Sequence, residues 1–170
     1  PAASPTMSIS DAIVGEGDGY VDVPVTLNTP STSTTPITVN YSMSNGTAIN
    51  TSDYEAISSN LAFLPGQTTT TIRIQILDNN VDAEGFEYFT VSLSALSGAT
   101  SAKSLAQVDI VDNDTNTTTP RVFVRDALVD ESAGFATVPV LLGGPAGQSS
   151  TSTVTVNYAT SGSGLEATSG

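Results

Sequence analysis

The segment Asp78–Glu87, DNNVDAEGFE, carries four carboxylates and three carboxamide or glycine positions suited to loops, between two stretches that alternate like β-strands. Carboxylate and amide oxygens at this density can bind a hard cation. Calcium takes six to eight such oxygens in a tolerant geometry, whereas magnesium requires fewer protein oxygens and a stricter octahedron. Zinc prefers cysteine and histidine, and the chain has neither. The segment therefore favours calcium among the common divalent ions.

The composition limits the partners of the chain. There are 17 Asp and Glu residues against 4 Lys and Arg, giving a net charge of −13. Nucleic acids and anionic membranes repel such a chain, and no apolar run of membrane-spanning length is present, so we expect no nucleic acid and no membrane insertion. Without cysteine or histidine, thiolate catalysis and Ser-His triads are excluded. We expect the chain to be a binding module rather than an enzyme. The simpler explanation of the acidic charge is that it keeps the protein soluble.

Apolar residues alternate with polar ones along seven short stretches, and no stretch has helical periodicity. This pattern predicts an all-β fold: an immunoglobulin-like antiparallel β-sandwich of seven strands over residues 7–114, with a barrel as the alternative. Residues 12–19 and 96–103 are expected to be turns. The predicted strands are 7–11, 20–27, 37–43, 61–64, 68–77, 88–95 and 105–111.

If successive strands run up and down, most acidic loop residues meet at one end of the sandwich. The opposite end has no acidic residue and holds Lys103, the only lysine. Crowded carboxylates raise one another's pKa values, and a divalent cation removes this repulsion. The alternative is that each of these acidic residues only forms a turn and faces solvent. The expected group is Glu16, Asp18, Asp53, Glu55, Asp78, Asp82, Glu84, Glu87, Asp112 and Asp114.

The pattern restarts after residue 120. The stretch FATVPVLL matches YVDVPVTL, and VTVNYATSG at 154–162 matches ITVNYSMSN at 37–45. We therefore expect a tail at 1–6, a full unit at 7–114, a linker at 115–120 and a partial second repeat at 121–170. The partial copy stops at Gly170, just before its counterpart of Asp53, so we expect a longer natural chain or completion by another chain.

These motifs resemble a family. In chain order the motifs are EGDG at 16–19, ITVNY at 37–41, SDY at 52–54, LAFLPGQTTTTIRIQILDNN at 61–80, and then EGFEYFTVSLS and VDIVDND. Their order is similar to that of a Calx-beta domain, a repeat of sodium/calcium exchangers, of an integrin beta chain and of large bacterial surface proteins. The resemblance covers residues 7–114 fully and 121–170 in part. It implies calcium ions held by Glu16, Asp53, Asp78, Glu84, Glu87, Asp112 and Asp114.

The resemblance implies a calcium-binding structural or adhesive module of a larger secreted or cell-surface protein. Calcium at the acidic end would stiffen the junction with neighbouring repeats of the same chain, and another protein chain or cell-surface ligand could be a partner. Two alternatives stay open: a calcium-sensing regulatory domain of a transporter or larger enzyme, and a calcium-independent subunit of a surface filament. Two further interpretations are weaker. Glu84 and Glu87 could be the carboxylate pair of a glycosidase, and Lys103 could form a side-chain crosslink.

Overall fold

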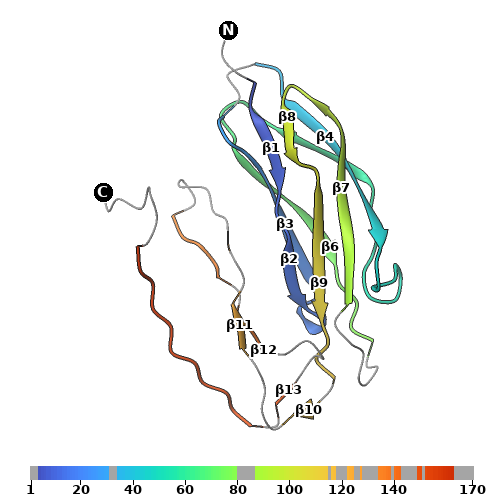
Figure 1. Cartoon of the computed structure of the whole chain (residues 1–170), viewed down its shortest axis with the longest axis vertical. Coiled ribbons are helices and arrows are strands. Elements are labelled where there is room, and N and C mark those ends of the chain that lie inside the picture. The colour runs from blue at the N-terminus through green and yellow to red at the C-terminus, as the bar shows by residue number, and fades with distance from the viewer. Residues whose placement is uncertain are drawn as a thin grey trace.

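The computed structural model describes residues 4–30, 34–79, 87–114, 116–117, 122–124, 127, 134–138, 140–142, 149–150 and 152–162. The described residues up to 114 form nine strands and one turn of 3₁₀ helix, η1 (Glu16–Asp18) (Figure 1). The strands are β1 (Thr6–Ile9), β2 (Ala12–Gly15), β3 (Tyr20–Leu27), β4 (Ile37–Asn45), β5 (Ser59–Phe63), β6 (Thr69–Gln75), β7 (Glu87–Ser97), β8 (Thr100–Lys103) and β9 (Leu105–Val111).

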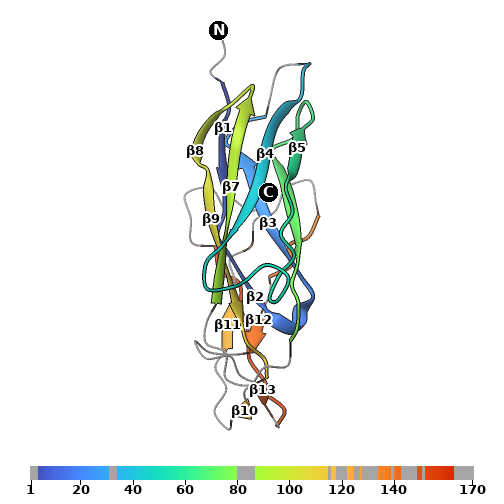
Figure 2. The same ribbon diagram turned by 90° about the vertical axis from the view of Figure 1, so that its right-hand side faces the viewer.

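The strands form two packed sheets, which confirms the predicted sandwich (Figures 1 and 2). One sheet has the order β6-β3-β1-β8 and the other β2-β9-β7-β4-β5. The strands also run up and down as expected. The loops that follow β2, β4 and β6, and the exit after β9, therefore lie at one end of the sandwich, the lower end in Figure 1. We call this the acidic end.

Two predicted turns contain strands. Residues 12–19 include β2, which leaves β1 and crosses to the other sheet, and residues 96–103 include β8. In the first stretch only the residues from Gly15 onward have the composition of a turn. Val14, immediately before them, is a fully buried strand residue. The prediction of purely antiparallel pairing also needs correction. β1 pairs with β8 in one sheet, and β2 pairs with β9 in the other, and both pairs are parallel.

The alternating apolar residues form the core between the sheets. Val21, Val23 and Val25 of β3 are buried, as the pattern predicted. Tyr54 stacks on Phe89 with a centroid distance of 3.9 Å, which fixes the loop after β4 against β7. Ala95, in the predicted strand 88–95, is exposed with φ 48° where the β4–β7 register shifts.

Beyond residue 114 the described residues contain two small pairs of strands. β11 (Val122–Val124) pairs antiparallel with β12 (Val140–Leu142), and β10 (Asn116–Thr117) pairs parallel with β13 (Ser149–Ser150). In the part of the chain that the structure describes, no helix has the length and apolarity to cross a membrane.

Candidate metal centre

The parallel pairing of β2 with β9 builds the centre of the acidic end. Val14 lies opposite Ile110 and Gly15 opposite Val111. Two neighbouring parallel strands finish at the same end of a sheet. The residues that follow β2 and β9, Glu16 and Asp112, therefore lie close together. Sequence reasoning placed both residues at this end but did not foresee the parallel ladder that sets them side by side.

Three carboxylates meet there. Oxygens of Glu16, Asp112 and Asp114 all lie within 4.8 Å of one another. Glu16 and Asp112 are each only 3% exposed, and Asp114 is half-buried. The Asp114 backbone N–H donates to Asp112 Oδ1 at 2.6 Å, which folds the exit of β9 back towards the cluster. Buried carboxylates normally have a counter-charge, so this arrangement suits a cation.

The electrostatics of Glu16 support this interpretation. Its pKa is raised to about 7, chiefly by burial and to a smaller extent by the negative charges of Asp78, Asp112 and Asp114. The backbone N–H of Asn79 donates to Glu16 Oε1 at 3.1 Å, and this hydrogen bond lowers the pKa of Glu16. One hydrogen bond does not outweigh burial among like charges, so the ionised cluster is unfavourable without a cation.

Asp53 borders the cluster and organises a loop. Its side chain is buried, and Oδ2 accepts the Ile49 N–H at 2.6 Å. The Asn79 side-chain amide donates to Asp53 Oδ1 at 3.4 Å, and the Leu77 N–H donates to the Asp53 carbonyl at 3.0 Å. Asn79 therefore connects Asp53 to Glu16. Among the described residues, Asp53 is outside the group of three close carboxylates.

The other predicted ligands have different positions. Asp78 is exposed, and its Oδ2 lies 3.6 Å from where a Cβ on Gly17 would be. Glu87 is half-buried at the start of β7, opposite Ile110, and does not belong to the close group. Glu84 lies outside the described residues, so its role stays a prediction.

Asn113, which was not among the predicted ligands, lies beside the three carboxylates. Its Oδ1 is buried and has no hydrogen-bond partner among the described residues. Its Nδ2 lies 2.9 Å from where a Cβ on Gly17 would be, so Gly17 leaves the space that the amide fills. A buried, unpaired amide oxygen beside three carboxylates is a suitable fourth donor for calcium. Its position between Asp112 and Asp114 was the available signal.

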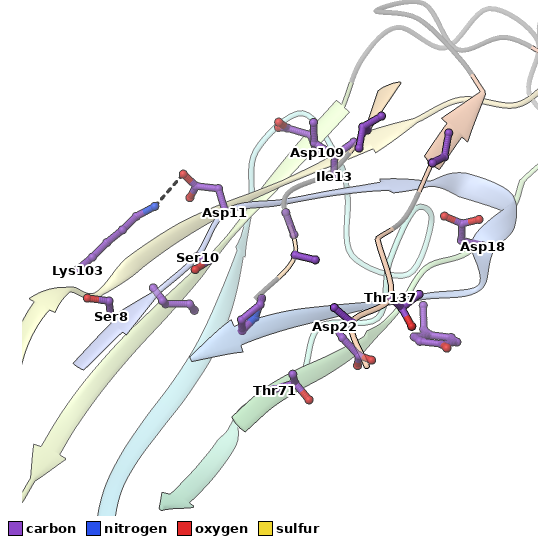
Figure 3. Close-up of a pocket in the computed structure, with 18 of the residues that line it drawn as sticks. Ser8, Ser10, Asp11, Ile13, Asp18, Asp22, Thr71, Lys103, Asp109 and Thr137 are labelled. Atoms are coloured by element: carbon purple, nitrogen blue, oxygen red, sulfur yellow. Dashed lines mark ion pairs between the residues drawn. The ribbon is translucent and has the colours of Figure 1, made fainter. Parts of the chain in front are cut away.

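Asp11, Lys103 and Asp109 form a group of charges that is separate from the metal centre. Lys103 pairs with Asp11 at 2.7 Å, and both side chains are largely exposed (Figure 3). The pKa of Asp11 is lowered by the hydrogen bond with Lys103 and by the Gln107 N–H, which donates to Asp11 at 2.9 Å. Asp109 is half-buried, and burial raises its pKa. The exposed Lys103–Asp11 pair is an ordinary ion pair, and its openness to water disfavours crosslinking.

Comparison with known proteins agrees with the fold. The family model of the Calx-beta domain matches residues 3–114 and again 113–170. The chain belongs to the Calx-beta family. The second matched segment contains the stretch after residue 120 in which the sequence pattern restarts. Curated protein sequences gave no match.

Solved structures of Calx domains have the same fold. The apo-form Calx CBD1 domain has a TM-score of 0.58 and 27% identity, covering 65% of this chain and 99% of that one. CBD12 from CALX1.2 has a TM-score of 0.57 and 24% identity, covering 70% and 54%. The calcium binding domain CBD12 of CALX1.1 has a TM-score of 0.56 and 20% identity, covering 80% and 69%.

Proposed function

We propose that this Calx-beta chain binds calcium at the acidic end, through Glu16, Asp112 and Asp114 with the amide oxygen of Asn113. The observation that carries the proposal is that three carboxylates, two of them buried and one half-buried, have oxygens within 4.8 Å of one another. These donors fit the cation, because calcium takes carboxylate and amide oxygens in an irregular shell. Asp78 is close enough to raise the pKa of Glu16 and would complete the shell. Asp53, Glu84 and Glu87 are further candidate ligands.

Bound calcium would act on the connection between the repeats. Glu16 follows β2, whereas Asp112 and Asp114 form the exit of β9, immediately before β10. A cation shared by these residues would tie the exit segment to the body of the sandwich. Without the cation, repulsion among the carboxylates would loosen that segment. We infer a structural role in which calcium stiffens the junction between successive repeats.

We further propose that the module works outside the cell, as a spacer or adhesive unit of a surface protein. Extracellular calcium-binding modules operate with dissociation constants of about 10⁻⁴–10⁻³ M, and the affinity of this site is expected in that range. The tandem family match supports a repeat array. Dependence of the junction on calcium at such concentrations would favour this role over intracellular sensing, which requires tighter binding.

Thermal unfolding of the chain in calcium, in magnesium and in chelator tests the proposal. At one hundred times the dissociation constant, calcium bound only to the folded state adds about 2.7 kcal/mol to the free energy of unfolding. We expect a clear rise in Tm with calcium and a smaller one with magnesium. The variant Glu55→Gln removes one exposed charge outside the cluster and should keep the full response. An unchanged Tm in all three conditions would contradict calcium binding.

A further inference from the structure

Among the described residues, the two sheets of the first sandwich have four edge strands, β6, β8, β2 and β5, and the first three are guarded. β8 ends in the exposed Lys103 and pairs with β1 through an irregular register. β6 carries Arg73, which is largely exposed and forms an ion pair with Asp22 of β3. β2 has only four residues and leads directly into η1 at the acidic end. Charges, shortness and bulges of this kind keep an edge from pairing with another chain.

β5 is the fourth edge strand and has none of these features. It ends the five-stranded sheet, and in the part of the chain that the structure describes only β4 pairs with it. Its five residues, SNLAF, include no charge and no proline, and its register with β4 is regular. No charged residue occurs between Glu55 and Arg73. The outer side of β5 therefore offers a backbone edge with which a further strand can pair.

The surface around β5 is uncharged as well, although the chain has a net charge of −13. Residues 23–52, which include all of β4, and 88–102, which include all of β7 except its first residue, contain no Asp, Glu, Lys or Arg. Uncharged amides and hydroxyls line the sheet face beside β5, namely Asn40, Ser42, Asn60 and Ser94. Because two copies of an acidic chain repel each other, a second copy meets the least repulsion at this neutral region.

Exposed apolar side chains stand at both ends of β5. Ile57, two residues before the strand, is 39% exposed, and Leu64, immediately after it, is 61% exposed. Two β5 strands related by a two-fold axis run antiparallel, so the beginning of one strand lies beside the end of the other. Ile57 of each copy would thus come close to Leu64 of the other. The patch is self-complementary, as a two-fold contact requires.

Antiparallel pairing along β5 also keeps the acidic ends apart. β4 runs towards the acidic end, and β5, which is antiparallel to it, runs away from that end (Figure 2). Two copies that pair along β5 in opposite directions therefore have their acidic ends at opposite ends of the dimer. A parallel arrangement would place both acidic ends together, where their charges repel.

We propose that β5 is a docking edge for a second copy of this chain. The two β5 strands pair antiparallel about a two-fold axis, so that the two five-stranded sheets become one continuous sheet. A strand pair of five residues is only ~17 Å long and belongs with the small, transient interfaces. We therefore expect weak dimers that form at high protein concentration, in calcium and in chelator alike.

Sedimentation equilibrium of the full chain, from micromolar to millimolar concentration, tests this proposal. The weight-average mass should rise towards twice that of the monomer. Ala62→Lys places a charge at an exposed position of β5 and should weaken the association by about tenfold or more. The matched control is Ala102→Lys, at an exposed position of the edge strand β8, which changes the net charge equally and should leave the association intact. Thermal melts establish that both variants are folded.

Crosslinking maps the contact without adding charge. The chain has no cysteine, so Ala62→Cys and Ala102→Cys each offer a single thiol to a short bismaleimide. A crosslinked dimer is expected from Ala62→Cys and not from Ala102→Cys, and equal yields from both would overturn the proposal. A wild type that stays monomeric at every concentration would overturn it too. So would a dimer that persists in Ala62→Lys or is lost equally in Ala102→Lys, because the contact would then lie elsewhere.

Discussion

The two ends of the first sandwich are closed in different ways. At the end opposite to the acidic one, uncharged groups complete the turns. Gln67 Oε1 accepts the Leu64 N–H at 3.1 Å, its amide donates to the Thr69 carbonyl at 3.0 Å, and Asn28 Oδ1 accepts the Thr6 N–H at 2.7 Å. At the acidic end, Glu16, Asp53 and Asp112 are buried carboxylates.

The difference shows that one core can support an end closed by hydrogen bonds between uncharged groups and an end at which carboxylates are buried. The hydrogen bonds at the opposite end form within the chain and need no ion. The acidic end has mutually repelling charges, which burial makes more costly. We therefore expect the two ends to respond differently to calcium, to pH and to substitution.

The largest effect is expected from Asp112→Asn. It removes a charge from the cluster, so calcium should no longer raise Tm, and the roughly 2.7 kcal/mol gained at a hundredfold excess over Kd should be lost. In chelator the variant should be as stable as the wild type or more so, because repulsion falls. Thermal melts measure both. Gln67→Ala, at the opposite end, should lower Tm equally in calcium and in chelator.

Asp53→Ala tests whether Asp53 organises the loop or binds the ion. It leaves the Ile49 N–H without its acceptor, which should cost about 1–3 kcal/mol of stability in calcium and in chelator alike. Chemical denaturation measures this cost. A normal stability in chelator combined with a loss of the calcium response would show that Asp53 is a ligand and would contradict the loop role.

The raised pKa of Glu16 predicts how the metal-free protein responds to pH. The folded state holds this proton up to about pH 7, whereas the unfolded state loses it near 4.5. The contribution to stability is therefore full below 4.5 and declines as the pH rises to 7. Melts in chelator between pH 4.5 and 8 should show this decline, and Glu16→Gln should flatten it. Calcium should reduce it too, since the cation stabilises the ionised form.

The smallest effect is expected from Lys103→Gln. The Lys103–Asp11 ion pair is largely exposed, so its loss should change the free energy of unfolding by less than about 1 kcal/mol. The calcium response should be intact, because the pair lies away from the cluster. A loss of calcium binding in this variant would mean that the whole surface charge, rather than the acidic end, controls the response.

Much of this architecture follows from local patterns. The period-two alternation around Val21, Val23 and Val25 predicts a half-buried strand, and the up-and-down order of strands gathers the acidic loops. The pattern cannot reveal that the first strand changes sheets at Ser10–Asp11, because both halves alternate alike. That crossing creates the parallel β2–β9 ladder, and with it the contact between Glu16 and Asp112.

The candidate site was predicted only as a group of loops. Which carboxylates come within ligand distance depends on turn geometry, such as the Asp114 N–H bond to Asp112. Asp53 resembles a ligand in sequence, but its hydrogen bonds to Ile49 and Asn79 place it at the border. Asn113 was missed as a donor because its burial results from the space above Gly17, which the sequence alone does not show.

Isothermal titration of the metal-free chain with calcium tests the central claim most directly. Saturable binding by the wild type and by Glu55→Gln, with no binding by Asp112→Asn, is the predicted result. Binding that survives in Asp112→Asn would place the ion elsewhere. No saturable heat in the wild type, at calcium concentrations up to about ten times the expected 10⁻³ M limit and at two temperatures, would contradict the account.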